Sequence, residues 1–356
     1  MTAFALFLIS VLSGRSDSIT GEVFPEKTWE RRSPAAVGLD PKSLERFSRF
    51  TGGRGCVVRF GYLVYTWGDY KRRGDVASAC KPWFSHFLFK ALEDKRIPSL
   101  DQKVVVWEPR LAELNPPLGH KDRLITWRHL ATQTSCYGVA EKPGTAFCYN
   151  DWQMALFWDL LFCRVYGASY DTVDNKVLHP LLTDPLGCQD NPTFMAFGTR
   201  DRPGRVGVSP RDFCRFGLLY LHKGNWRGKQ LLSKRFAVMA VTSPLPADLP
   251  RAGKTPAEMI PGQRSLGSRR IPDNQCDHEG SYSFLWWING VNRRGKRLWP
   301  GVPHDAYGAF GHGGPRAMTV IPSLRLIVSW NDAHLEGWNR VGKALRLLVE
   351  ACKRKI

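Results

Sequence analysis

The stretch Ser78-Ala-Cys-Lys81-Pro-Trp-Phe-Ser-His-Phe-Leu-Phe-Lys-Ala-Leu-Glu93 places a serine and a lysine three residues apart where an apolar run begins. If Ser78 opens a helix, Lys81 lies about one turn on, ~4.5 Å along the axis and on the same side. A serine hydroxyl attacks carbonyls well only after a base takes its proton, and lysine is such a base when its amine is neutral. The helix N-terminus adds N–H groups that can hold an oxyanion. This spacing predicts Ser78 as a nucleophile and Lys81 as its base.

Chance offers an alternative interpretation of the pair. A chain of 356 residues with ordinary composition contains roughly one Ser-x-x-Lys by accident. Taken alone, the two side chains are therefore better explained as surface residues. Other segments of the chain have to decide between the two interpretations.

Length and composition describe an ordinary globular protein. With 356 residues, 43% of them hydrophobic and 23% charged, the chain can bury a sizeable core, and it has no low-complexity tract or internal repeat. We expect one unit over residues 36–350, made of two packed lobes and present as a monomer. Strand-like segments near both ends predict a sheet lobe made of residues of about 36–100 and 276–350. The sequence between them predicts a helical and loop-rich lobe over about 101–275.

The net charge of +19 would suit an anionic partner. The basic residues fall in short, separated groups without a zinc-finger, helix-turn-helix or RNA-binding pattern beside them. We therefore expect a solvated basic surface and no specific binding of nucleic acid. Affinity for a polyanion that collapses with rising salt would favour the alternative.

The first residues form an apolar stretch that is too short to span a bilayer as a helix. Residues 1–20 are typical of a signal peptide or a disordered leader, which predicts a secreted or periplasmic protein. Two features favour a cytoplasmic protein instead, because no Lys or Arg precedes the stretch and no A-x-A cleavage site follows it. No later segment is long and apolar enough to predict a transmembrane span.

The nine cysteines are dispersed and contain no CxxC pair. Their spacing does not fit a zinc cluster, so we expect neither a metal nor a cofactor. Most are expected to be small buried hydrophobic residues, and one or two disulfides stay possible if the chain is exported.

Start signals and periodicity predict the elements along the chain. Helices are expected after Asp40-Pro41, from Ser78 to Asp94, over 126–134 and 152–162, after Ser209-Pro210, and over 338–352. Strands are expected as a hairpin over 55–68 and at 281–289, 317–322 and 324–330. Residues 243–275, rich in Pro, Gly and Arg, predict a long surface loop or lid.

Two further motifs carry polar groups that suit chemistry. In Pro143-Gly-Thr-Ala-Phe-Cys-Tyr149-Asn-Asp151, a turn delivers a tyrosine and an acid just before a helix. Tyr149 could relay protons if nearby cations lower its pKa, although this segment alone is better explained by a packed Tyr149 with Asp151 as a helix cap. In Gly311-His312-Gly313-Gly314-Pro315, glycines beside a polar residue allow close approach of a ligand, or form a bulge with a solvent-facing His312.

The three motifs in this order, with 71 residues from Ser78 to Tyr149 and 163 more to His312, resemble those of the β-lactamase-related serine hydrolases. That family includes class C β-lactamases, penicillin-binding proteins, D-stereospecific peptidases and family VIII-type esterases. The similarity covers roughly residues 36–350. Four further segments also resemble the family: Ile97-Pro-Ser-Leu-Asp101, Ile125-Thr-Trp-Arg-His-Leu-Ala-Thr-Gln-Thr-Ser135, Pro143-Gly-Thr145 and Asp184-Pro-Leu-Gly187.

The resemblance implies a fold of the α+β class, with an antiparallel sheet flanked by helices and a mostly helical lobe beside it. It implies that Ser78 is acylated, that Lys81 is its base partner and that Tyr149 moves protons. Asp151 would take the place of an asparagine that contacts the substrate. His312, Gly313 and Gly314 would correspond to the K-T-G or H-x-G strand, which also binds substrate.

Two positions depart from the family's pattern. A carboxylate at Asp151 would favour the protonated form of Lys81 unless it points away. In the register implied by His312, Pro315 falls where the family's strand offers the second oxyanion N–H, and proline has none. Losing one such donor costs ~3 kcal/mol in the transition state.

The sequence thus predicts a serine hydrolase that forms an acyl-enzyme on a small-molecule or peptide ester, amide or lactam. Trp286, Trp287 and Trp152 are candidates for an aromatic wall of its site, although core packing explains at least half of them. The two departures leave an alternative, a noncatalytic protein of the same fold that binds cell-wall or peptide ligands.

Overall fold

The computed structural model describes residues 21–196, 203–270 and 273–352. The leader predicted for residues 1–20 lies outside this part of the chain. No helix within the described ranges is both long enough and apolar enough to cross a membrane.

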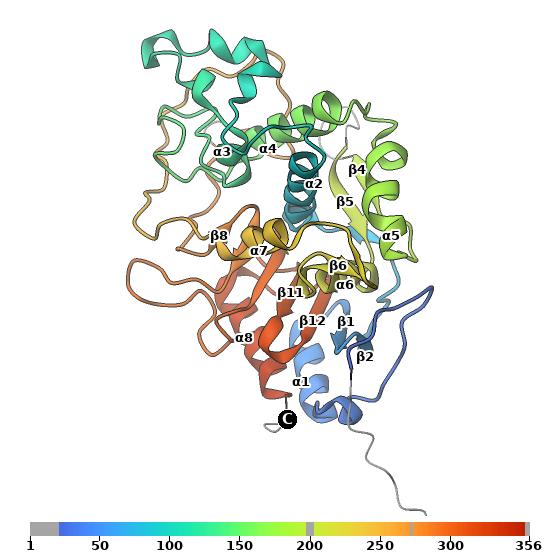
Figure 1. The fold of residues 1–356 in the computed structure, drawn as a ribbon. Coiled ribbons are helices and arrows are strands. Elements are labelled where there is room, and N and C mark those ends of the chain that lie inside the picture. The colour runs from blue at the N-terminus through green and yellow to red at the C-terminus, as the bar shows by residue number, and fades with distance from the viewer. Residues whose placement is uncertain (1–20, 197–202, 271–272, 353–356) are drawn as a thin grey trace, which may run out of the picture.

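A seven-stranded sheet forms the centre of the lower half of the molecule in Figure 1. Its strands run in the order β2-β1-β12-β11-β10-β9-β8, and every neighbouring pair is antiparallel. Their bounds are β1 Arg54–Arg59, β2 Tyr62–Trp67, β8 Tyr282–Ser283, β9 Trp286–Ile288, β10 Tyr307–Gly311, β11 Arg316–Ile321 and β12 Leu326–Asn331. Both ends of the chain therefore contribute to one sheet, and the predicted antiparallel sheet with flanking helices is confirmed.

Smaller ladders lie outside this sheet. β3 (Gly74–Asp75), β5 (Pro203–Val208) and β4 (Thr193–Ala196) form a second sheet, while β6 (Asn225–Trp226) pairs with β7 (Lys229–Gln230). The single strand predicted over 281–289 is wrong. Phe284 and Leu285 have φ angles of 38° and 70°, so the chain turns there and β8 folds back on β9.

The helices of the described chain are mostly short, and several are 3₁₀ or π turns. The α-helices are α1 Pro41–Thr51, α2 Lys81–Glu93, α3 Trp127–Ala131, α4 Asp151–Trp158, α5 Asp184–Leu186, α6 Pro210–Leu221, α7 Lys234–Thr242 and α8 Gly337–Glu350. Predicted start signals are confirmed at three of them, because side chains of Asp40, Thr126 and Ser209 accept hydrogen bonds from the first turns of α1, α3 and α6.

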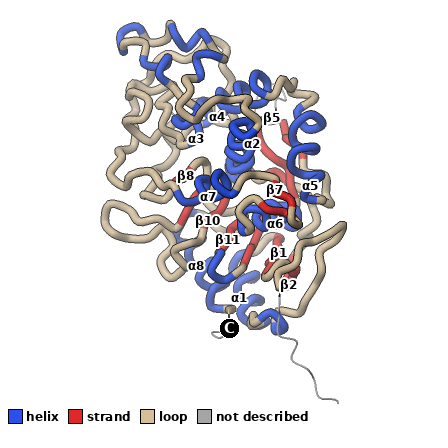
Figure 2. The backbone as a smooth tube through the Cα atoms, viewed as in Figure 1, coloured by secondary structure: helices blue, strands red, loops and turns tan. Residues whose placement is uncertain are grey.

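Helices cover both faces of the large sheet (Figures 1 and 2). Side chains alternate along a strand, so on β12 Ile327 and Trp330 face opposite sides. A Cβ added at Gly217 of α6 would touch Ile327, whereas Phe47 of α1 meets Trp330 at a ring distance of 6.3 Å. α6 therefore packs on one face, and α1, together with its neighbour α8, packs on the other.

The region with α3 and α4 lies above the sheet in Figure 1, and α2 stands between the two. α2 is buried almost all round, with Trp83, Phe84 and Phe87 each at 0% exposure. α6 comes from the middle of the chain and yet packs on the sheet. The exact boundaries between the two lobes stay a prediction. The structure places the 3₁₀ turn Ala77–Cys80, which leads into α2, beside β10.

Candidate active site

Ser78 lies on a tight 3₁₀ turn, Ala77–Cys80, which leads directly into α2 at Lys81. The prediction that Ser78 itself opens the α-helix is wrong by one turn. Asp75 Oδ1 accepts a hydrogen bond of 2.7 Å from the Ala77 N–H, and Ala77 takes a φ of 50°, which a residue with a Cβ seldom adopts. Such strain costs about 1 kcal/mol or more and persists where surrounding contacts enforce it. We call residues 77–80 the nucleophile turn.

Lys81 reaches back to the serine as its spacing predicted. Its Nζ donates a hydrogen bond of 2.8 Å to Ser78 Oγ, and the residue is only 3% exposed. The same Nζ lies 4.6 Å from the ring centroid of Tyr149 and 3.8 Å from Asp151 Oδ1. The structure therefore brings these four predicted residues together around one amine.

Tyr149 is 5% exposed and lies against Lys81 and Ser78. Burial raises the pKa of Tyr149 well above its ordinary value, and a hydrogen bond with Ser78 opposes this only in part. The sequence-based condition that cations lower this pKa is not met. Tyr149 is therefore a neutral phenol that can donate a proton or a hydrogen bond.

Asp151 is the first residue of α4, but Asn150, whose side chain accepts from the Gln153 N–H at 2.8 Å, is the cap. Asp151 Oδ2 accepts a hydrogen bond of 3.3 Å from the Ser268 N–H, which leaves Oδ1 directed at Lys81. Its carboxylate thus points toward the lysine. The capping role that sequence alone left open for Asp151 belongs to its neighbour.

The strand that touches the nucleophile turn ends at Gly311, earlier than predicted. A Cβ at Gly311 would lie 2.3 Å from the Val76 carbonyl oxygen, so only glycine lets β10 approach so closely. Residues 312–315 form the turn to β11, and the Pro315 carbonyl accepts a hydrogen bond from Ala333 beyond β12. The register that placed Pro315 beside Ser78 is therefore wrong.

In the observed register, the residue that follows the contact with the nucleophile turn has a backbone N–H group. His312 follows the point of contact at Gly311 directly. Among the described residues, neither the Ser78 N–H nor the His312 N–H donates a hydrogen bond to another residue. These two backbone groups are the candidate pair of oxyanion donors.

The His312 side chain is held by its neighbour across the turn. Arg316 Nη1 donates to His312 Nδ1 at 3.2 Å, so the ring's proton is assigned to Nε2. Burial lowers the pKa of His312, and the positive charges of Arg316 and Arg205 lower it further. Arg316 also lies 3.5 Å from Asp75 Oδ2, which connects His312 to the residue that supports the nucleophile turn.

Ser78 opens into a pocket of about 240 Å³. The residues lining it are Ser78, Tyr149, Gln275, Cys276, Trp287, Phe310, His312, Gly313 and Trp338. Gly314 is not among them, because a Cβ there would meet Val341 and Leu335 on the side of α8.

Of the three tryptophans considered from sequence, only Trp287 lines the pocket. Trp286 points to the other face of the sheet and stacks on Phe216 at 5.6 Å, and the Trp152 indole N–H bonds to the Arg270 carbonyl. Sequence reasoning missed Phe310 and Trp338, as well as Gln275 and Cys276 from the loop after α7. Alternation along β10 could have marked Phe310, but nothing in the sequence places α8 at this pocket.

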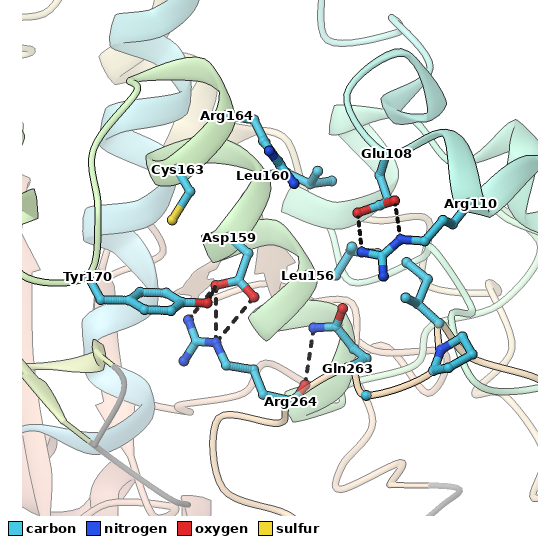
Figure 3. A pocket seen from close by; sticks show the side chains of 13 residues that line it. Glu108, Arg110, Leu156, Asp159, Leu160, Cys163, Arg164, Tyr170, Gln263 and Arg264 are labelled. Carbon is cyan, nitrogen blue, oxygen red and sulfur yellow. Dashed lines mark hydrogen bonds and ion pairs between the residues drawn. The ribbon is translucent and has the colours of Figure 1, made fainter. Parts of the chain in front are cut away.

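A second pocket, of about 220 Å³, lies in the helical region away from Ser78 (Figure 3). Its charges are largely paired internally: Arg110 holds Glu108 through two hydrogen bonds of 2.7 Å, and Arg264 holds Asp159. None of the predicted site residues lines it. It lacks a nucleophile–base pair like that of Ser78 and Lys81.

Comparison with solved structures identifies the fold. A protein assigned as a 6-aminohexanoate-dimer hydrolase, from Bacillus anthracis, matches with a TM-score of 0.61 and 14% identity, over 92% of this chain and 87% of the other. A penicillin-binding protein homologue from Caulobacter crescentus matches at 0.59 and 13%, over 88% and 99%. A class C β-lactamase matches at 0.56 and 12%, over 91% and 97%. The chain has the β-lactamase and penicillin-binding-protein fold that its motifs predicted.

Sequence comparison adds no closer relative. No family model matches the chain, and no curated protein does. At these identities the structural matches establish the fold and leave the chemistry to the site itself.

Proposed function

We propose that the protein is a serine hydrolase that forms an acyl-enzyme on Ser78 with an ester, amide or lactam. The observation that carries this proposal is the 2.8 Å hydrogen bond between Lys81 Nζ and Ser78 Oγ at the wall of a pocket. A serine and a lysine in such contact are the nucleophile–base arrangement that acyl transfer needs.

In the proposed reaction, Lys81 Nζ accepts the Ser78 proton while Oγ attacks the substrate carbonyl. The backbone N–H groups of Ser78 and His312 stabilise the oxyanion that forms. The tetrahedral intermediate then collapses, and the leaving group departs with a proton from the Tyr149 phenol, which Lys81 replaces. Water attacks the acyl-enzyme by the same route in reverse, which releases the acid and restores Ser78.

Asp151 opposes one step of this mechanism, the removal of the Ser78 proton by Lys81. Its carboxylate lies 3.8 Å from Lys81 Nζ and attracts the ammonium form, which competes with the use of Lys81 as a base. This observation also favours a second candidate function, in which the same pocket binds a ligand without turning it over. The two functions differ in whether Ser78 becomes covalently modified.

The deciding experiment is labelling with a fluorophosphonate probe followed by mass spectrometry of the intact protein and its peptides. We expect one adduct, located on Ser78, in the wild-type protein and none in Ser78→Ala. Ser85→Ala is the matched control, because Ser85 is buried in α2 and bonds to the Pro82 carbonyl. A folded wild-type protein that takes up no probe, or takes it up equally in Ser78→Ala, would exclude the hydrolase.

A further inference from the structure

Three aromatic side chains from separate elements form one side of the Ser78 pocket. Trp287 of β9, Phe310 of β10 and Trp338 of α8 are hereafter called the aromatic wall. Trp338 meets Trp287 at a ring distance of 4.5 Å and Phe310 at 5.3 Å, and Tyr149 continues the surface 6.4 Å from Trp287. Trp287 and Phe310 are at most 4% exposed, so packing holds their rings before any ligand arrives.

The pocket offers no charged partner. None of its lining residues is Asp, Glu, Lys or Arg, and His312 is held as a neutral ring by its surroundings. Two cationic side chains beside the pocket already lie near carboxylates, Lys81 near Asp151 and Arg316 near Asp75. A substrate carboxylate would therefore lose its hydration here without gaining a free cation in return.

The size of the pocket limits what it can hold. A cavity of about 150 Å³ lined by apolar side chains holds one benzene molecule. At about 240 Å³, the Ser78 pocket has room for one aromatic ring and a few further atoms. Flat rings also gain from offset or edge-to-face contacts with aromatic side chains such as those of the wall.

We infer that the Ser78 site takes uncharged substrates that carry one aromatic ring next to the scissile carbonyl, and that it disfavours substrates with a carboxylate at that place. The ring packs against the aromatic wall while the carbonyl faces Ser78. This inference rests on the proposed function for its chemistry and on the pocket alone for its selectivity.

Hydrolysis by the full chain can be followed as proton release, which needs no coloured leaving group. Methyl phenylacetate carries the ring on the acyl side and benzyl acetate carries it on the alcohol side. Methyl butyrate has no ring, and 4-carboxybenzyl acetate adds a carboxylate to the ring. We expect at least one ring ester to exceed methyl butyrate about tenfold or more in kcat/KM, and benzyl acetate to exceed its carboxylated analogue by a similar factor.

Trp338→Ala should lower kcat/KM for the ring ester about fivefold more than it lowers kcat/KM for methyl butyrate. Trp107→Ala is the matched control, because Trp107 is also half-buried but packs on Trp127 in the helical region. Ring esters no better than methyl butyrate, or a carboxylated ester as good as benzyl acetate, would overturn the inference.

If no ester is hydrolysed and Ser78 takes no probe, the proposed function fails but the selectivity is still testable. Calorimetric titration of Ser78→Ala with benzyl acetate and with 4-carboxybenzyl acetate measures binding without chemistry. Tighter binding of the neutral ester, weakened by adding Trp338→Ala, supports the inference. Equal binding of both esters, or binding of neither, contradicts it.

Discussion

The two sides of the Ser78 pocket are built in different ways. On one side, Ser78 and Lys81 come from consecutive turns of a single segment, and their contact follows from helical spacing. On the other side, Tyr149, His312 and the aromatic wall come from segments that are far apart in the chain and meet only because sheet and helices pack. The comparison teaches that the Ser78–Lys81 pair is a local feature, whereas the proposed oxyanion site and the proposed selectivity depend on strand register.

The largest effect is expected on the local side. Ser78→Ala removes the nucleophile and should lower kcat by about 10⁴-fold or more, to the level of the uncatalysed reaction plus binding. Lys81→Met should lower it by a similar factor, because the two residues act as a unit. Steady-state kinetics on the best ester measures both, and additive losses in the double variant would contradict a shared role.

The next effect tests how closely β10 has to lie against the nucleophile turn. In Gly311→Ala the new Cβ falls 2.3 Å from the Val76 carbonyl oxygen, so β10 has to withdraw from the nucleophile turn. Overpacking of this kind costs about 1–3 kcal/mol of unfolding free energy, and a shift of about 1 Å at a site can cost 10²-fold in rate. Urea unfolding and kcat together measure the change.

Gly342→Ala is the matched control for that experiment. Its Cβ would meet nothing closer than 3.7 Å, and alanine in a helix interior is favoured over glycine by about 0.5–1 kcal/mol. We therefore expect unchanged activity and equal or higher stability. A Gly311→Ala protein that behaves like Gly342→Ala would show that the approach of β10 does not matter for catalysis.

A smaller effect is expected from the electrostatic interaction between Asp151 and Lys81. Asp151→Asn removes the carboxylate 3.8 Å from Lys81 Nζ but keeps an oxygen that can accept from the Ser268 N–H. Since the ammonium form of Lys81 loses a partner, we expect kcat at neutral pH to rise by up to about tenfold. Asp159→Asn, in the pocket of Figure 3, should leave kcat unchanged. A fall in kcat for Asp151→Asn would mean that the carboxylate itself takes part in catalysis.

The smallest effect concerns the pH dependence of His312. The pKa of His312 is lowered by burial first, and then by the positive charges of Arg316 and Arg205. The imidazole therefore stays neutral down to a lower pH than an ordinary histidine does. Arg316→Ala removes one of these causes, and the pKa should move up toward the ordinary value. The acid limb of kcat/KM should therefore move to higher pH, while Arg110→Ala leaves it in place. An acid limb that moves to lower pH, or does not move, would separate His312 from the reaction.

Much of the fold could be predicted because its signals are local. Asp40, Thr126 and Ser209 cap helices where the sequence placed their starts, and strand-like runs of residues marked β11 and β12. Errors arose where the backbone conformation of one or two residues changes the direction of the chain. Left-handed conformations at Phe284 and Leu285 split the predicted strand, and the sequence carried no glycine there to reveal the turn.

The sequence by itself determined the spacing of Ser78 and Lys81, since a turn of helix places two such residues together in any fold that forms it. Tertiary structure alone decided that Gly311 meets the nucleophile turn, that His312 and not Pro315 lines the pocket with Ser78, and that Trp338 of α8 lines it too. The reason is that strand register and the docking of α8 depend on contacts summed over the whole sheet, which no short segment contains.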